Sequence, residues 1–285
     1  MKRKSVIIDR NALTEFRDYL QEKENSTATI EKYMRDIKKF IDFTGETREV
    51  SKEILLRYKE WLIEQYAVSS VNSMLVALNQ FLSFLELGRM KLKRIKVQRI
   101  NLHQMERELS KEEFRKLVRT ARSAGKEQLA MIMETMGATG VRVSELKFFR
   151  TDNIQSGVIK VCNKGKHRIV VIPTILRKKL LFYIKKNRIR SGMIFCTRTG
   201  KEKNRSNIWK EMKMAAGRAK VALEKVFPHN LRHLFARTFY KETKNLINLA
   251  DLLGHSNLDV TRIYASEGIK EWRRDIEKIK IIETT

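Results

Sequence analysis

Cysteine, proline and long apolar runs are scarce in this chain, and each scarcity excludes a class of protein. Two cysteines, Cys162 and Cys196, are too few for a disulfide framework or a cysteine-rich zinc site, and they favour a reducing, cytoplasmic setting. Two prolines and 12 glycines argue against collagen-like or low-complexity sequence. No run of about 18 apolar residues is present, so no membrane span is expected. A GxxxxGK[ST] phosphate loop is also missing, which argues against an ATP-driven motor.

Acidic residues are also in short supply. The 285 residues include 60 Lys and Arg against 33 Asp and Glu, a formal net charge of +27. This excess favours a polyanionic partner, either nucleic acid or an anionic membrane surface. The membrane surface is the weaker interpretation, because no predicted helix combines a strong apolar face with a flanking polybasic face. The length and the 42% hydrophobic content are enough for two domains with ordinary cores.

Residues 1–88 are predicted to form a small helical bundle. A helical period runs through residues 30–41, and shorter patterns around 13–20, 54–62 and 71–85 predict three more helices. Ser51 is the expected N-cap of the helix around 54–62. Gly88 is expected to end the last helix. Residues 89–105 are then predicted to be a basic interdomain linker that lies along a DNA backbone, with a merely solvated linker as the alternative. Its DNA-contacting side chains would be Arg89, Lys91, Lys93, Arg94, Lys96 and Arg99.

Residues 106–285 are predicted to form a second domain that is mainly helical with a small inserted sheet. Ser110 to Glu113 reads as a capping box ahead of an apolar helix. Residues 157–162 and 168–172 are β-rich and flank a basic, glycine-containing tip, which predicts a hairpin closed by Pro173. The fold class is therefore mainly α with a small β-sheet.

Four segments of the second domain carry groups suited to phosphate chemistry. Such chemistry needs cationic donors for the nonbridging oxygens, a nucleophile, and an acid for the leaving group. Taken singly, each group is typical of an ordinary surface or packing residue; their succession over about 120 residues is the signal. In chain order they are Arg142 after a glycine turn at the start of an apolar helix, Lys164 at the hairpin tip, His229 and Arg232 on one helix face, and a Gly-His turn at His255 followed by Tyr264.

The segments around these residues resemble a known family. ATGVRVSELKFF (138–149), NKGK (163–166), HNLRHLFA (229–236) and LLGHSNLDVTRIYA (252–265) are similar to the tyrosine recombinases, the integrases of the phage lambda class, and most of all to their short Xer-like members. STATIEKYMRDIKKFIDF (26–43) resembles the core-binding domain of that family. The resemblance implies a SAM-like core-binding domain followed by an α+β catalytic domain.

The resemblance also implies a role for each matching residue. Tyr264 would be the nucleophile that leaves a 3′-phosphotyrosine and a free 5′-hydroxyl. Arg142 and Arg232 would hold the scissile phosphate. Lys164 would protonate the 5′ oxygen, with Lys166 as the alternative for this role.

Other matching residues would act around this centre. His229 would serve as the base toward the tyrosine, His255 would hydrogen-bond a nonbridging oxygen, and Glu145 and His233 would support the site without reacting. Two arginines and a lysine would supply the charge that other enzymes take from Mg²⁺, so no metal is expected. No cofactor and no ATP are expected, since the phosphotyrosine stores the energy of the broken bond.

The implied partner is double-stranded DNA. A homotetramer would hold two DNA sites and exchange strands through a Holliday junction, with an accessory or paralogous recombinase as an optional further partner. The amphipathic tail, residues 268–285, would dock onto a neighbouring protomer. The activity would be site-specific recombination, as in Xer-like resolution or mobile-element integration and excision. The alternatives are a non-catalytic DNA-binding regulator of the same fold and strand relaxation like that of a type IB topoisomerase.

Overall fold

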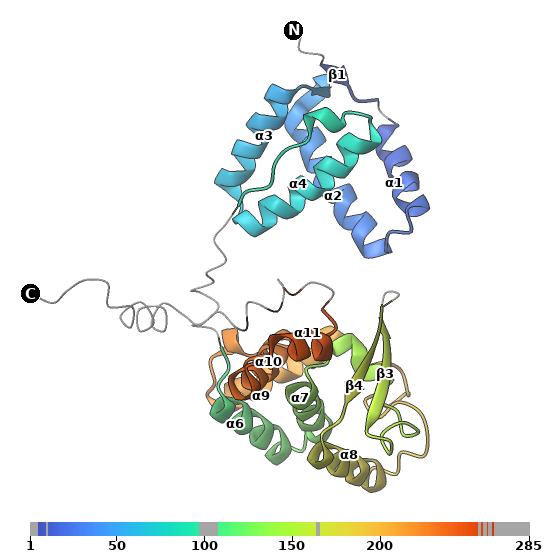
Figure 1. Cartoon of the computed structure of the whole chain (residues 1–285), viewed down its shortest axis with the longest axis vertical. Coiled ribbons are helices and arrows are strands. Elements are labelled where there is room, and N and C mark those ends of the chain that lie inside the picture. Colours follow the sequence, from blue (N-terminus) through green and yellow to red (C-terminus); the bar gives the residue numbers. More distant parts are fainter. Residues whose placement is uncertain are drawn as a thin grey trace, which may run out of the picture. The chain divides into compact units, whose positions relative to one another are not determined.

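The chain forms two compact units, residues 1–98 and 99–285 (Figure 1). The computed structural model describes residues 5–9, 11–96, 108–163 and 166–255, together with Leu258, Thr261 and Tyr264; the side chains at 163 and 166 are not included. In this described part, no helix is long and apolar enough to cross a membrane. The two units are called the N-terminal unit and the C-terminal unit below.

The N-terminal unit is a bundle of four helices, as the sequence predicts. A short antiparallel ladder, which the sequence did not indicate, pairs the chain near its start with the segment ahead of the third helix. The core between the helices is aromatic, and Phe16, Phe40 and Phe81 are completely buried. The elements are β1 (Val6–Ile7), α1 (Ala12–Glu22), α2 (Thr27–Thr44), a 3₁₀ turn (Gly45–Thr47), β2 (Glu49–Val50), α3 (Lys52–Gln65) and α4 (Val68–Phe84).

Helices α2 and α3 of this unit begin at serine caps, Ser26 and Ser51. Ser51 accepts a hydrogen bond from the backbone of Ile54 and is the N-cap of α3, as predicted. The prediction that Gly88 ends α4 is wrong, because α4 stops at Phe84 and Gly88 begins a 3₁₀ turn, Gly88–Met90. Glu86 takes the left-handed conformation (φ 59°) that glycine usually supplies at a helix end.

An extended segment after α4 lies against that helix. Two asparagines of α4 hold it by pairing with its backbone in the same way. The side chain of Asn79 accepts from the Leu92 N–H and donates to the Leu92 carbonyl, both at 2.9 Å. Asn72 does the same for Ile95, at 2.7 and 3.0 Å. Residues 89–96, called the basic strap below, are therefore fixed to the N-terminal unit, and Leu92 is buried.

The strap keeps its charged side chains in solvent. Leu92 and Ile95, three residues apart, pack against the bundle core and leave the basic residues outside. The exposed basic residues are Arg89, Lys91, Lys93, Arg94 and Lys96. Arg99, the sixth predicted DNA contact, lies outside the described residues.

The C-terminal unit is helical with one inserted hairpin. The capping box forms as predicted, since Ser110 and Glu113 each accept a hydrogen bond from the other's backbone N–H, at 3.0 and 2.8 Å. The elements are α6 (Lys111–Ser123), α7 (Glu127–Thr139), a 3₁₀ helix (Val143–Phe148), β3 (Val158–Asn163), β4 (Lys166–Val171), α8 (Thr174–Lys186), α9 (Arg205–Ala219), a 3₁₀ turn (Leu223–Lys225), α10 (Pro228–Thr243) and α11 (Leu246–Leu253).

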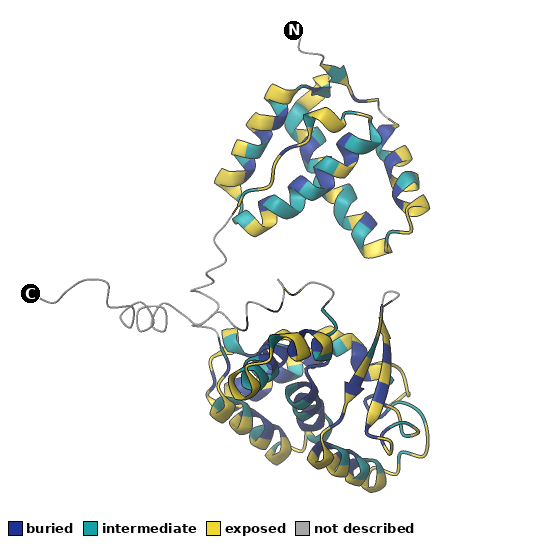
Figure 2. Ribbon diagram, in the orientation of Figure 1, coloured by how far each residue is buried: buried dark blue, intermediate teal, exposed yellow. Residues whose placement is uncertain are grey.

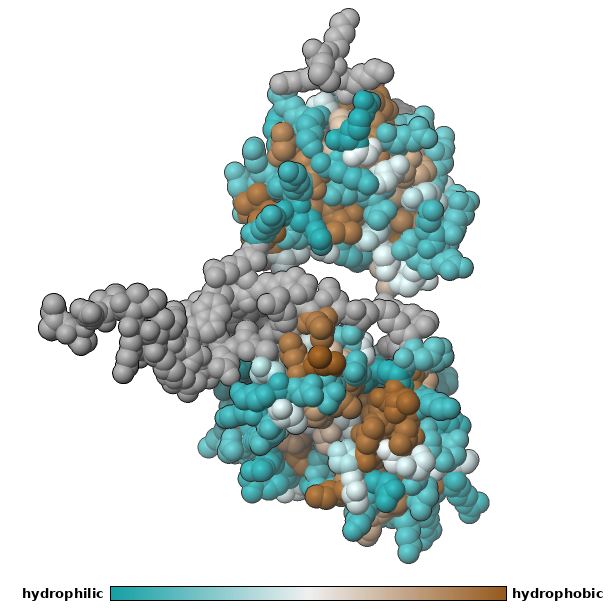
Figure 3. Space-filling model, in the orientation of Figure 1, coloured by the Kyte–Doolittle hydropathy of each residue, from teal (hydrophilic) through white to brown (hydrophobic). Residues whose placement is uncertain are grey.

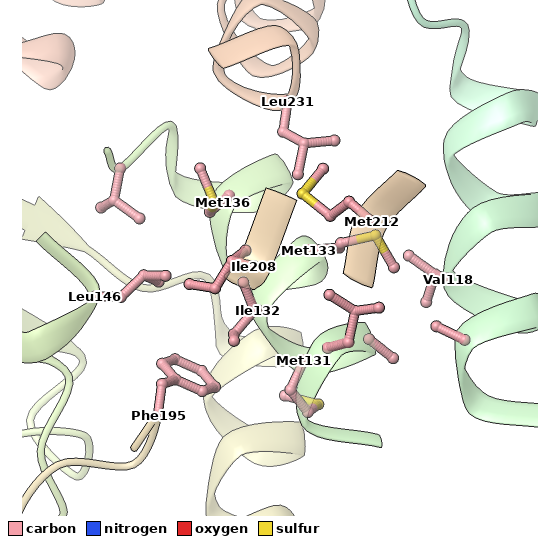
Figure 4. Packing of buried hydrophobic residues seen from close by; sticks show 14 of the residues in the cluster. Val118, Met131, Ile132, Met133, Met136, Leu146, Phe195, Ile208, Met212 and Leu231 are labelled. Carbon is pink, nitrogen blue, oxygen red and sulfur yellow. The ribbon is translucent and has the colours of Figure 1, made fainter. Parts of the chain in front are cut away.

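Helix α7 lies at the centre of this unit and is dark blue over most of its length in Figure 2. Figure 4 shows its methionines and isoleucine packed among side chains from the surrounding elements. Ile132 and Met133 are completely buried, as are Met212 of α9 and Leu231 of α10. This close packing of buried side chains holds α7 in place, together with the backbone at its C-terminal end, which contributes to the active site.

The hairpin has one buried and one exposed face. Its strands extend closer to the tip than predicted, because Asn163 pairs with Lys166 and His167 with Cys162. Ile159, Val161 and Val170 are buried, and Figure 3 shows an apolar patch over the hairpin, where Val158, Ile169 and Val171 are exposed. The residue on β4 that follows the buried register toward the tip is Arg168, which enters the site described next.

Candidate active site

Arg232 of α10 is a fully buried charged group at the centre of the site. Its side chain is 1% exposed, and it donates to the carbonyl oxygens of Gly140 at 2.8 Å and Leu253 at 2.7 Å. Burial lowers its pKa to about 10, helped by the charges of Arg142 and Arg168, so it is a cation at neutral pH. The guanidinium is therefore fixed by the backbone ends of α7 and α11.

Gly140 allows this arrangement. It ends α7 with φ +65°, and a Cβ there would lie 2.5 Å from the Phe235 ring. Any side chain would therefore be strained in its backbone and would push into the ring. The glycine turn that the sequence placed before Arg142 thus also presents a carbonyl to Arg232.

His255 follows α11 and meets Arg232 directly. Its Nε2 lies 2.9 Å from Nη2 of Arg232, and its Nδ1 lies 2.9 Å from Oγ1 of Thr261. Because a guanidinium only donates, Nε2 must accept, and the ring proton therefore sits on Nδ1 and is donated to Thr261. Burial and the charge of Arg232 lower the pKa of His255 to about 4, so the ring is neutral at pH 7.

Arg142 caps a 3₁₀ helix that contains Glu145, where the sequence suggested a longer apolar helix. Glu145 is 1% exposed and accepts from the Arg142 backbone at 2.7 Å and from its Nη1 at 3.0 Å. Arg168 donates to both oxygens of the same carboxylate, at 2.6 and 3.3 Å. Burial works to raise the pKa of Glu145, but these hydrogen bonds and charges outweigh it, so the pKa is lowered and the carboxylate is ionised.

Tyr264 packs against two histidines. Its ring centroid lies 5.2 Å from that of His233 and 6.4 Å from that of His255, and its side chain is buried. Burial raises the pKa of the Tyr264 phenol, although Arg232 opposes this by its charge and a hydrogen bond. The phenol is therefore protonated at pH 7 and needs a base to become a nucleophile.

Two neutral histidines of α10 lie beside this tyrosine. The His233 ring stands edge-on to that of His229, with centroids 4.4 Å apart. Burial lowers the pKa of His233 to about 3, and partial desolvation followed by the charges of Arg232 and Arg142 lowers the pKa of His229. Both rings can accept a proton at neutral pH, and His229 is the one with an exposed edge.

A groove of about 1620 Å³ opens over this site. Its wall includes three arginines, Arg142, Arg168 and Arg232, and two of the histidines, His229 and His255. A smaller pocket of about 230 Å³ shares Arg142, His229 and Arg232 with it and adds Lys203 and Arg205. In the described part of the chain, no group of three or more His, Cys, Asp or Glu side chains is placed to hold a metal ion.

The structure brings together seven of the residues that the sequence singled out: Arg142, Glu145, His229, Arg232, His233, His255 and Tyr264. Lys164 lies outside the described residues, as does the side chain of Lys166. Sequence reasoning missed Arg168 and Thr261. Only the inward register of β4 pointed to Arg168, and only its place one helical turn before Tyr264 pointed to Thr261.

Comparison with known proteins agrees with this site. The family described as "Phage integrase family" matches residues 107–270, and "Phage integrase, N-terminal SAM-like domain" matches residues 13–87. The chain therefore belongs to the phage integrase family. It is a tyrosine-type site-specific recombinase, and the predicted enzyme class and fold class are confirmed.

Relatives of similar length carry the same class name. Tyrosine recombinase XerA of Thermococcus kodakarensis is 30% identical over 281 residues, which cover 95% of this chain and 96% of the relative. XerA of Pyrococcus horikoshii is 28% identical over 295 residues, covering 100% and 99%.

Solved structures share the fold. XerH recombinase bound to its difH substrate, in a post-cleavage complex, has a TM-score of 0.73 at 16% identity and covers 95% of this chain and 89% of that one. A lambda integrase tetramer bound to a Holliday junction has a TM-score of 0.69 at 17% identity, covering 94% and 80%.

Proposed function

We propose that this recombinase cuts and rejoins double-stranded DNA through a 3′-phosphotyrosine at Tyr264 and exchanges strands through a Holliday junction. The observation that carries the proposal is a groove lined by three guanidinium groups and one ionised carboxylate, in which the buried Arg232 also interacts with the Tyr264 phenol. Arg142, Arg168 and Arg232 against Glu145 leave two surplus positive charges. A phosphodiester brings one negative charge, and the pentavalent transition state brings more, so the surplus favours the transition state.

Strand cleavage would begin with the phenol. The Tyr264 oxygen attacks phosphorus while His229 takes its proton, which the lowered pKa of His229 permits at neutral pH. His233 packs between the two rings and keeps them in place. Arg142 offers an accessible guanidinium to the phosphate, with 39% of its side chain exposed. Arg232 stabilises the phosphate from the buried floor of the groove.

The bond from phosphorus to the 5′ oxygen breaks as the bond to tyrosine forms. Lys164 is proposed to give the proton to this leaving oxygen, with Lys166 as the alternative. His255 is proposed to hydrogen-bond a nonbridging oxygen through Nε2. In the DNA-free structure this atom accepts from Arg232, so that role requires the ring proton to move from Nδ1 to Nε2.

The rest of the chain would bind DNA and neighbouring protomers. We propose that residues 1–88 are the core-binding domain, that the basic strap and the remainder of residues 89–105 follow the DNA backbone, and that residues 106–285 are the catalytic domain. Four protomers would hold two sites, with residues 268–285 docked onto a neighbour, as the tetramer of lambda integrase on a Holliday junction suggests. An accessory or paralogous recombinase would be a further partner, and the cytoplasm the proposed location.

Covalent trapping with nicked duplexes tests the proposal. The duplexes would come from DNA flanking the gene and from a random pool, in EDTA and without ATP. Denaturing gels should show protein joined to DNA, and sequencing of the trapped DNA should give the target site. A plasmid carrying two such sites should then yield recombined products. Relaxed plasmid without recombinants would favour the topoisomerase activity, and tight binding with no covalent product would favour the regulator.

A further inference from the structure

The guanidinium of Arg168 in β4 is largely buried and fully hydrogen-bonded within the protein, unlike that of an ordinary surface arginine. Its side chain is 9% exposed. Nη2 and Nε donate to the two oxygens of Glu145, and Nη1 donates to the carbonyl oxygen of Leu252. Every nitrogen of the guanidinium thus has a protein acceptor, and Arg168 is committed to the protein rather than to a phosphate.

These contacts join three separate parts of the site. Glu145 belongs to the 3₁₀ helix that begins after Arg142, Arg168 belongs to the hairpin, and Leu252 lies three residues before His255 at the end of α11. The approach is close: a Cβ at Gly254, which has φ +64°, would lie 2.5 Å from Cδ of Arg168. The glycine of the Gly-His turn is therefore required by the Arg168 side chain as well as by its own backbone conformation.

The Glu145 carboxylate is shared between two arginines. It accepts two hydrogen bonds from the Arg168 side chain and two from Arg142, one of them from the backbone. A buried carboxylate that lost Arg168 would have to draw its compensation from Arg142 alone or become protonated. The first response would pull the Arg142 guanidinium away from the groove.

We propose that Arg168 is a positioning residue for strand cleavage, which sets the Arg142 guanidinium through Glu145 and the His255 turn through the Leu252 carbonyl. This inference rests on the proposed function, because its readout is the phosphotyrosine reaction. Arg168 would leave the DNA affinity nearly unchanged, since its donors do not face the DNA, and would act on the rate of the chemical step.

Single-turnover formation of the covalent adduct at saturating DNA, beside the Kd for the same duplex, tests the proposal. Arg168→Gln should lower the adduct rate about 100-fold, the loss typical of a misplacement of about 1 Å, with Kd within about threefold of wild type. Arg168→Lys should also be impaired, because a single ammonium does not reproduce the guanidinium fork that reaches both carboxylate oxygens and the carbonyl. Arg150→Gln is the matched control, an exposed arginine that pairs with Asp152 across a surface turn.

A rescue separates positioning from a general loss of structure. Adding Glu145→Gln to Arg168→Gln should recover at least about tenfold in rate, because the amide no longer needs the guanidinium charge. The rate ratio of Arg168→Gln to wild type should also rise as pH falls from 7 to 5.5, since Arg168 contributes most to lowering the pKa of Glu145, ahead of Arg142, and protonation would release Arg142. Glu145→Gln should abolish that rise.

The outcomes are distinct. If wild type forms no adduct, the proposed function fails. If wild type and Arg150→Gln react while Arg168→Gln stays within threefold of them, or loses DNA affinity instead of rate, the positioning role is overturned. If circular dichroism shows that Arg168→Gln is unfolded at the assay temperature, the adduct rates of Arg168→Lys and of the double variant test the positioning role instead. Equal loss in the Arg168→Gln, Arg168→Lys and double variants contradicts the proposal.

Discussion

Acidification from pH 7 to pH 5 should destabilise the C-terminal unit through two histidines, the buried His233 and the partly buried His255. The pKa of His233 is about 3 in the folded chain because of burial and then the nearby charges of His229, Arg237 and Arg232. In the unfolded chain it is about 6.5. The folded pKa is the lower one, so the unfolded state binds more protons below pH 6.5. Stability is therefore lost as pH falls from 6.5 toward 3.

The magnitude follows from the two pKa values. One histidine with an unfolded pKa of about 6.5 and a folded pKa of about 3 removes about 1.9 kcal/mol of unfolding free energy between pH 7 and pH 5. His255, with a folded pKa of about 4, would remove nearly as much, but it is only partly buried and solvent screening reduces its share to about 1 kcal/mol. The expected total is about 3 kcal/mol.

Urea unfolding at the two pH values measures this loss. Fluorescence of Trp209 in α9 reports on the C-terminal unit once Trp61 and Trp272 are replaced by Phe. His233→Gln should remove about 1.9 kcal/mol of the pH dependence, whatever it does to stability at pH 7. His167→Gln, at an exposed hairpin position, is the matched control. An unchanged pH dependence in His233→Gln would refute the reasoning.

Three other predictions concern backbone, strap and charge. Gly140→Ala should destabilise the C-terminal unit by about 2–4 kcal/mol in urea unfolding, because alanine there has a positive φ and collides with Phe235. Gly45→Ala, at nearly the same φ but with open space around its Cβ, should cost less, and equal losses would contradict this. Asn79→Ala leaves two backbone groups of the strap without their partner. Calorimetry should show that the unfolding free energy of the N-terminal unit falls by about 1–3 kcal/mol, and no change would contradict the account. DNA affinity should fall steeply with salt concentration. Replacing the five exposed basic residues of the strap with Gln should reduce the slope of log K against log salt by about 4 in a fluorescence titration. An unchanged slope would place the strap away from DNA.

Local patterns explain what the sequence predicted well. The capping box at Ser110 and the face of α2 that carries Ile30, Ile37 and Phe40 depend on neighbours within a few turns, so their chemistry is visible in the sequence. Arg232 and Tyr264 were recognisable from motif spacing. Their burial was not, because a motif does not say which carbonyl oxygens receive a guanidinium.

Long-range partners explain what the sequence did not predict. Arg168 is one of 60 basic residues, and its acceptors lie 23 and 84 residues away, so no spacing rule marks it. The strap looked like an open linker because the two asparagines that bind it belong to the preceding helix and resemble ordinary polar positions there. The end of α4 was misplaced because Glu86 takes a conformation usually left to glycine.

Identification of the residue joined to DNA tests the central claim most directly. Trapped adducts from wild type, Tyr264→Phe and Tyr240→Phe would be digested with protease and nuclease, and the modified peptide sequenced by mass spectrometry. Tyr240 is the matched control, since it packs in the same small cluster as Tyr264. The account predicts a nucleotide on Tyr264 in wild type and Tyr240→Phe and no adduct in Tyr264→Phe. An adduct on another residue, or one that survives Tyr264→Phe, would contradict it.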